Sequence, residues 1–142
     1  MGFDRPVNGD RAETEILDHS GDEFSATFEA CGVIAIGDAK RIKVVVDLTT
    51  KGSVAALTCK LRTSSEATAP SNATATDWST RQWHATAGDL TLTDYEPDVA
   101  VAAAGRFEFV FDVDGVWASP MVKVDAATSS RGKVYAYRSR KK

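Results

Sequence analysis

The stretch RIKVVVDLTTKGSVAALTCKLRT, residues 41–63, decides the fold class. Its first part alternates β-branched or aliphatic residues with polar ones, which is typical of a strand that buries one face. After the turn signal Lys51-Gly52-Ser53, Leu57, Cys59 and Leu61 alternate with polar residues in the same way. The two parts are therefore predicted to be strands, and we expect them to form a hairpin. The residues predicted to share the buried face of the first strand are Ile42, Val44, Val46 and Leu48.

The same alternation recurs along most of the chain. Phe107, Phe109 and Phe111 share one face of a strand predicted over residues 106–113, and apolar residues alternate again over 23–30. No window has an apolar pattern of helical period, and turn residues recur every 8–12 positions. We predict an all-β fold, a single antiparallel β-sandwich of the jelly-roll or Ig-like kind, although a small barrel has the same alternation. The predicted parts are an N-terminal arm (1–22), the sandwich (23–138) and a basic tail (139–142).

Composition limits both the core and the class of protein. The 142 residues suit one domain, and 21 of them are alanine against 6 leucine, so each buried side chain removes little area from water. This thin core suggests stabilisation by a partner or by self-association. No apolar run reaches the length of about 18–20 residues that spans a bilayer, and the polar, acidic residues 1–15 do not resemble a signal peptide. The small polar residues of 64–76 predict an exposed loop.

Charge is unevenly distributed. Residues 1–29 hold eight acidic and two basic side chains, whereas the last twelve residues, RGKVYAYRSRKK, hold six basic and no acidic ones. This tail is either solvated chain or a segment that docks on an acidic surface, such as the N-terminus of a neighbouring subunit. Specific binding of nucleic acid is not expected, because the body of the chain is acidic and the basic stretch is short.

Few residues point to chemistry. Cys31 and Cys59 are either small buried hydrophobic residues or a disulfide, and neither has a second ligand at metal-binding spacing. His19 and His84 are predicted to be surface or strand-end histidines. Asp112, Asp114 and Asp125 are candidate calcium ligands, but Asp114-Gly115 is interpreted as the tip of a hairpin turn rather than part of a calcium loop. No catalytic motif is recognisable, so we expect a protein that is not an enzyme and binds no cofactor or metal.

Tryptophans are candidates for contact with a partner. Trp78 and Trp83 have opposite parity within one predicted strand, so we expect one of them to be exposed. An exposed tryptophan is either an interface anchor or a platform for a sugar, as in carbohydrate-binding β-sandwich modules. The candidate interface residues are Trp83, Trp117, Arg138, Arg140, Lys141 and Lys142.

Residues of about 41–138 resemble the small all-β structural proteins of tailed bacteriophages. The resemblance is carried by residues 41–65, by the variable loop that leads to Asp77-Trp78, and by GRFEFVFDVDG and MVKVDAATSSRGKVYAYR. It implies an accessory or decoration protein on the capsid or at a head-tail or tail interface, with other virion proteins and further copies of itself as partners. It also implies synthesis in a host cytoplasm and assembly into the virion. The predicted arm, residues 1–22, is not covered, and a carbohydrate-binding module is the alternative.

Overall fold

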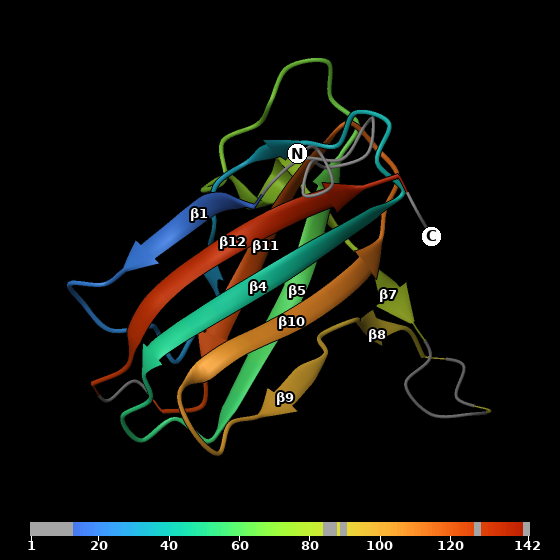
Figure 1. The fold of residues 1–142 in the computed structure, drawn as a ribbon. Helices are drawn as coiled ribbons and strands as arrows, with labels where there is room; N and C mark the ends of the chain where they lie inside the picture. Colours follow the sequence, from blue (N-terminus) through green and yellow to red (C-terminus); the bar gives the residue numbers. More distant parts are fainter. Residues whose placement is uncertain (1–12, 84–87, 89–90, 127–128, 141–142) are drawn as a thin grey trace.

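The computed structural model describes residues 13–83, 88, 91–126 and 129–140, and this part of the chain is all-β (Figure 1). Sheet A has the strand order β1-β12-β4-β10, and sheet B has the order β2-β11-β5-β6, with β3 also on β11 and β9 also on β5. Strands β7 and β8 form a separate pair, and η1 is a short 3-10 helix. The bounds are β1 Thr14–His19, β2 Glu29–Ala30, β3 Ile34–Ala35, β4 Arg41–Thr50, β5 Ala56–Ser64, η1 Ala75–Asp77, β6 Ser79–Thr80, β7 Gln82–Trp83, β8 Thr93–Asp94, β9 Asp98–Ala100, β10 Gly105–Asp112, β11 Trp117–Val124 and β12 Arg131–Ser139.

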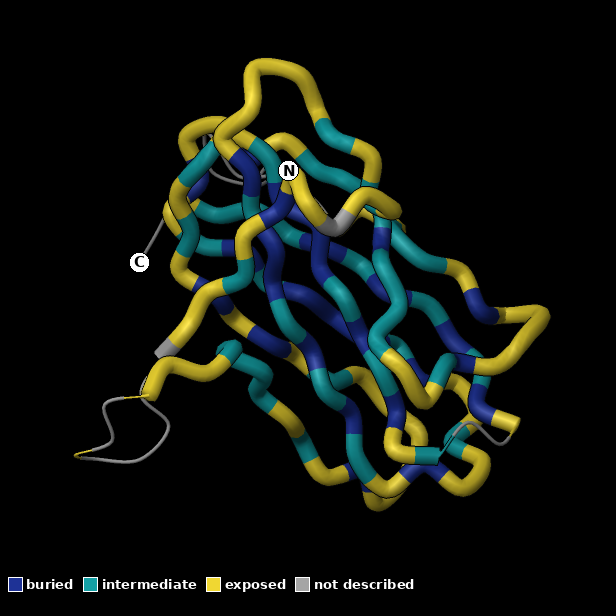
Figure 2. The backbone as a smooth tube through the Cα atoms, turned by 180° about the vertical axis from the view of Figure 1, so that it is seen from behind, coloured by how far each residue is buried: buried dark blue, intermediate teal, exposed yellow. Residues whose placement is uncertain are grey.

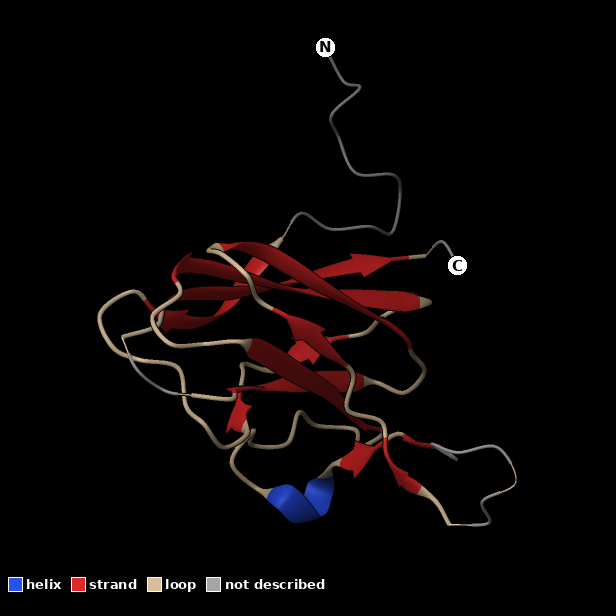
Figure 3. Ribbon diagram, turned by 90° about the horizontal axis from the view of Figure 1, so that it is seen from below, coloured by secondary structure: helices blue, strands red, loops and turns tan. Residues whose placement is uncertain are grey.

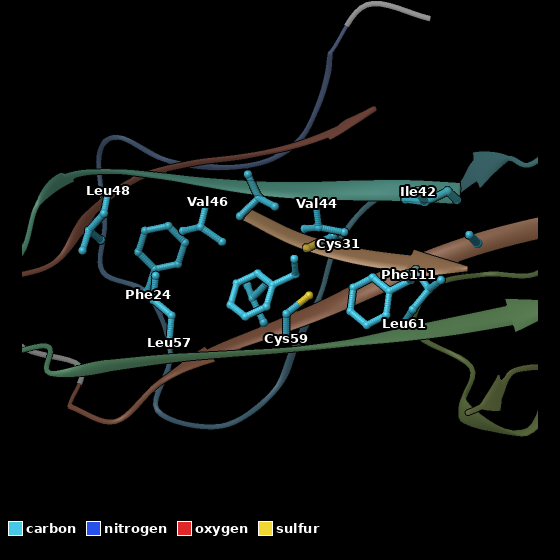
Figure 4. Packing of buried hydrophobic residues seen from close by; sticks show 14 of the residues in the cluster. Phe24, Cys31, Ile42, Val44, Val46, Leu48, Leu57, Cys59, Leu61 and Phe111 are labelled. Atoms are coloured by element: carbon cyan, nitrogen blue, oxygen red, sulfur yellow. The ribbon is translucent and has the colours of Figure 1, made fainter. Parts of the chain in front are cut away.

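The two sheets pack face to face around one apolar core. Figure 3 shows them as two layers of strands, and Figure 2 shows that the buried residues lie along the strands while most of the connecting loops are exposed. All four residues predicted for the buried face of β4 are at most 1% exposed, which confirms the alternation. In Figure 4 their side chains point from β4 into the core, toward those of β5. The core residues of β5 are Leu57, Cys59 and Leu61. Phe109 and Phe111 of β10, the strand beside β4 in the same sheet, are buried in the same core.

The predicted hairpin between residues 41–49 and 55–63 is wrong. Strand β4 pairs with β10 and β12 in sheet A, whereas β5 pairs with β11, β6 and β9 in sheet B. After Gly52, which has φ of +59°, the chain crosses from one sheet to the other, and Val54 is fully buried. The Asp125 carboxylate accepts the N–H groups of Ala55 and Ala56 over 2.8 and 3.1 Å. The apolar faces of β4 and β5 therefore bury one another instead of lying side by side on one sheet.

The N-terminal part of the fold also differs from the prediction. Residues 14–19 of the predicted arm are strand β1, which pairs antiparallel with β12, and residues 1–12 lie outside the described residues. The strand predicted over 23–30 is reduced to Glu29–Ala30. Phe24 is still buried, but Phe28 lies beside the ammonium groups of Lys60 and Lys123, which are 4.4 and 4.8 Å from its ring centroid. Alternation over this segment therefore reflects separate packing positions rather than a regular strand.

The two cysteines are free thiols inside the core. Cys31 and Cys59 are both fully buried and no disulfide joins them. Burial raises the pKa of the Cys31 thiol to about 12 and raises that of Cys59 well above its ordinary value. Of the two alternatives that the sequence left open, the structure shows the small buried hydrophobic residue.

Replacing Gly132 by alanine tests the packing of β12 on β4. Gly132 lies at the bulge of β12, where a Cβ atom would overlap the Asp47 carbonyl oxygen and lie 3.1 Å from the Leu48 Cα. We expect Gly132→Ala to lower the free energy of unfolding by about 3 kcal/mol, because backbone atoms have to move. Urea unfolding measures this change. Gly105→Ala is the matched control, since nothing lies within 4 Å of its Cβ position, and equal losses in both variants would contradict the prediction.

Candidate functional site

Three of the predicted interface residues lie at one end of the sandwich, around the turn that follows β3. Trp117 begins β11 and is paired with Ala35 of β3. The guanidinium of Arg138 reaches the same residue from β12 and donates to the Ala35 carbonyl oxygen over 2.6 Å. Arg140 lies 3.6 Å from the carboxylate of Asp38 in the turn. The structure therefore brings Trp117, Arg138 and Arg140 together, although the first is more than 20 positions from the other two.

The other three predicted interface residues are described less fully. Trp83 is the last residue of β7, and the structure does not describe its side chain. Lys141 and Lys142 lie outside the described residues. Trp83 does not share a strand with Trp78, because Trp78 follows η1 and precedes β6. The parity argument that compared these two tryptophans therefore does not apply.

A cleft of about 800 Å³ lies beside Arg140. Its residues come from the end of β10, the end of β5, β6 and the segment before β4. They combine basic, acidic and hydroxyl side chains around apolar residues, so the cleft can form hydrogen bonds and ion pairs with a polar chain segment. The lining residues are Lys40, Leu61, Thr63, Ser79, Thr80, Arg81, Phe111, Asp112, Val113, Asp114 and Arg140.

The described tryptophans are held by the chain's own backbone. Trp78 is 9% exposed, and its indole N–H donates to the Ser71 carbonyl oxygen over 2.8 Å. Trp117 is half-buried, and its indole N–H donates to the Glu66 carbonyl oxygen over 3.0 Å. Stacking of a sugar needs an open aromatic face, and Trp78 does not offer one. Trp117 is only half-buried, which suits the edge of a protein contact.

Arg62 is a buried guanidinium on the outer side of sheet B, and the sequence analysis missed it. Only 6% of the residue is exposed, yet its hydrogen-bond partners are neutral oxygens. Its Nε and NH2 groups donate to the Ser119 carbonyl and hydroxyl oxygens over 3.2 and 2.8 Å, and NH1 donates to the Asn72 carbonyl oxygen over 3.0 Å. The Trp78 ring lies 5.2 Å away. Burial lowers the pKa of Arg62, because desolvation disfavours the charged guanidinium. The hydrogen bonds and the Trp78 ring together stabilise that charge.

The predicted exposed loop is present but is tied to the sheet beneath it. Residues 65–69 are exposed, as the composition predicted. Besides accepting from Arg62, Asn72 donates from its side-chain amide to the Cys31 carbonyl oxygen over 2.9 Å, and the Ser119 hydroxyl donates to the same oxygen over 2.8 Å. The loop therefore covers the outer side of sheet B and leads directly into β6, one wall of the cleft.

His19 ends strand β1, so of the two predicted alternatives the structure shows the strand-end histidine, which is buried and has two carboxylate partners. Its Nδ1 is bonded to Asp22, its Nε2 lies 2.7 Å from Glu29, and the ring packs edge-on against Phe24 with 4.9 Å between centroids. Burial lowers the pKa of His19, but the hydrogen bonds to Asp22 and Glu29 raise it by more. The resulting pKa lies above the ordinary value of 6.5. His84 lies outside the described residues.

The charged residues near both ends of the described chain contact other groups of the same chain. All six acidic residues between 13 and 29 contact a group of the same chain, and so do the four described basic residues of the last twelve. Glu15 and Lys133, for example, lie 2.9 Å apart where β1 pairs with β12. The basic C-terminal strand thus lies against the acidic N-terminal strand of its own chain. Docking on a neighbouring subunit's N-terminus stays a prediction.

The remaining candidate carboxylates do not converge. Asp112 and Asp114 line the cleft, whereas Asp125 binds backbone N–H groups at the other end of the sandwich. Among the described residues, no group of three or more His, Cys, Asp or Glu side chains could hold a metal ion.

Stability should decrease as the pH rises through the pKa of His19. The folded pKa lies above the unfolded one, so the contribution is complete below about pH 6.5 and is lost as the folded imidazolium deprotonates. We expect the urea midpoint to fall between about pH 6 and pH 8. His19→Gln should remove this dependence, while His84→Gln should keep it. A wild-type midpoint that rises over this range would contradict the assignment.

Removing the Arg62 guanidinium should destabilise the fold and release the loop. Arg62→Gln leaves buried oxygens of Ser119 and Asn72 without donors, which costs about 2–4 kcal/mol of unfolding free energy. Urea unfolding measures the loss, and limited proteolysis should show faster cleavage within residues 65–74. Arg81→Gln is the control, because Arg81 is exposed. The same proteolysis rate in both variants would show that Arg62 does not hold the loop.

No family model, no curated protein and no solved structure matches this chain. In the described residues, no helix has the length and hydropathy to cross a bilayer. The function has therefore to be inferred from the residues at the end of the sandwich and from their arrangement.

Proposed function

We propose that this chain is a non-enzymatic structural component of a phage virion that acts through protein–protein contacts. The observation that carries the proposal is the convergence of Trp117, Arg138 and Arg140 beside a cleft of mixed charge at one end of the sandwich. A surface that combines a half-buried tryptophan with arginines has the composition of a protein interface. The fold proposed with this role is a jelly-roll or Ig-like sandwich.

The geometry of this end suits a protein partner. The Arg138 guanidinium is fixed by the Ala35 carbonyl oxygen, so little side-chain entropy is lost when a partner covers it. Lys40, Arg81 and Arg140 line a cleft that also has serine and threonine hydroxyls, which can bind an acidic or polar chain segment. A surface of this kind binds a partner whose shape and charge are complementary to its own.

The virion context rests on the resemblance of residues 41–138 to phage structural proteins. The partners that it implies are capsid or tail subunits, and the location is an accessory position on the capsid or at a head-tail or tail interface. Because the proposed surface is rich in Lys and Arg, the matching surface of the partner subunit is expected to be acidic, and binding should weaken with salt.

The proposal is tested on particles. Virions from a culture that encodes this chain are purified on a density gradient, and mass spectrometry determines whether the chain is present. Stripped particles are then incubated with labelled protein. We expect Lys40→Gln/Arg140→Gln to bind at least about tenfold more weakly than the wild type, because both residues line the cleft and two charges are lost from the contact.

The control variant is Lys51→Gln/Arg131→Gln, which removes the same charge from the opposite end of the sandwich. It should bind like the wild type. Absence of the chain from purified particles would overturn the virion assignment. Equal binding by both double variants would overturn the assignment of the contact to this end of the sandwich.

A further inference from the structure

Strand β10 is an uninterrupted edge of sheet A. Its eight residues pair with β4 in continuous register from Gly105↔Leu48 to Asp112↔Arg41. It contains neither a proline nor a bulge, and no strand among the described residues pairs with its other side. Figure 1 shows it at the lower border of the front sheet. Such an edge is a ready template for another strand.

The opposite edge of the same sheet is protected. Strand β1 is broken by a register shift between Glu15 and Leu17. The Gly32 N–H also donates to the Ile16 carbonyl oxygen over 2.8 Å, which ties β1 to the segment between β2 and β3. Of the two edges of sheet A, β10 is therefore the one that can accept a further strand.

The direction of the free backbone groups of β10 follows from one hydrogen bond. The Val113 N–H donates to the Lys40 carbonyl oxygen over 3.1 Å, which places residue 113 in the set that bonds toward β4. Because this set alternates along an antiparallel pair, residues 107, 109 and 111 also bond toward β4. The N–H and C=O groups of the even-numbered residues then point away from the sheet. These residues are Arg106, Glu108, Val110 and Asp112, and all four are exposed.

The side chains of these four residues are complementary to their own copy in one register. If two β10 strands pair antiparallel about Phe109, Arg106 lies opposite Asp112 of the second copy and Glu108 lies opposite its Val110. A shift by two residues in one direction sets Glu108 against Glu108. A shift in the other direction sets Glu108 against Asp112. Of these three registers, only the one centred on Phe109 pairs opposite charges without a like-charge contact.

We propose that the chain forms a two-fold symmetric dimer in which the β10 strands of two copies pair antiparallel about Phe109. This joins the two A sheets into one continuous sheet. It also covers Val110, which is 47% exposed in the single chain. The dimer names the second copy as a partner and does not depend on the proposed contact with virion proteins, because it is argued from the backbone edge and the register of β10. The two surfaces meet at Asp112, which also lines the cleft beside Arg140.

The existing ion pairs of β10 do not oppose this dimer. Asp112 lies 3.6 Å from Arg41, and Glu108 lies 3.5 Å from Lys43. Arg106 lies 2.7 Å from Glu13 and 3.4 Å from Asp47. The side chains of all four pairs are at least 30% exposed, and ion pairs at the surface contribute little to stability. Exchanging one for a cross-strand pair therefore costs little. Charge selects the register, while the new backbone hydrogen bonds and the covered Val110 supply the affinity.

Two charge variants at position 110 test the dimer and its register. Sedimentation equilibrium of the full chain should show a dimer. In the proposed register Val110→Glu meets Glu108 of the second copy at two symmetric contacts, so we expect dimerisation to weaken by at least about tenfold. Val110→Lys meets the same Glu108 and should keep the dimer. Glu and Lys are both long, charged side chains, so the two variants differ mainly in the sign of the charge at position 110. Circular dichroism checks that both variants fold.

Other outcomes overturn the proposal. Loss of the dimer in Val110→Lys but not in Val110→Glu would place Arg106 opposite position 110, and loss in both would place Val110 opposite itself. A dimer that persists in Val110→Pro would show that this edge is not used, because proline removes an outward N–H without touching the β4 ladder. A wild-type chain that is monomeric up to about 0.5 mM would also overturn it.

Hydrogen exchange on the wild type gives an answer that needs no variant. Amides of Arg106, Glu108, Val110 and Asp112 should become protected as the protein concentration rises, because they bond across the dimer. Amides of the odd-numbered residues should be protected at every concentration. Exchange at the even-numbered positions that is independent of concentration would contradict pairing at this edge.

Discussion

The change of sheet between β4 and β5 is the constraint on which the rest of the fold depends. Asp125 fixes this crossing, because its carboxylate accepts two consecutive backbone N–H groups just before β5 and its own N–H donates to the Ala56 carbonyl oxygen over 3.2 Å. These hydrogen bonds lower the pKa of Asp125. With the crossing in place, the apolar faces of the two strands bury one another. Without it, both faces would lie on the same side of one sheet and need a second layer to cover them.

A single buried guanidinium connects this core to the candidate site. Arg62 lies on the outer side of β5, where it binds Ser119 of β11 and the loop at Asn72. It is also paired with Thr80 of β6, one of the residues that line the cleft. The buried guanidinium has lost its hydrating water, and protein oxygens at hydrogen-bonding distance take the place of that water. The loop that supplies one of these oxygens therefore has few alternative positions. The shape of the cleft therefore depends on how the strands of sheet B pack.

The sequence predicted the faces of strands well and their partners poorly. The alternations in β4 and β10 follow from the period of two, and the structure confirms both. The same pattern does not say which strand lies alongside, so the hairpin was wrong. Arg62 looked like one more polar residue on a solvated face, because nothing local shows the loop that covers it. His19 was missed in part because Glu29 is ten residues away, and the cleft because its lining comes from separate elements.

Because its two thiols are buried in the core, the fold does not depend on redox conditions. Cys31 and Cys59 are buried and unbonded, and their raised pKa values leave almost no thiolate at neutral pH. Oxidants and alkylating reagents react with the thiolate, so they reach these sulfurs only when the core opens. The same folded chain can therefore persist in a reducing cell and in an oxidising exterior without any change in covalent structure.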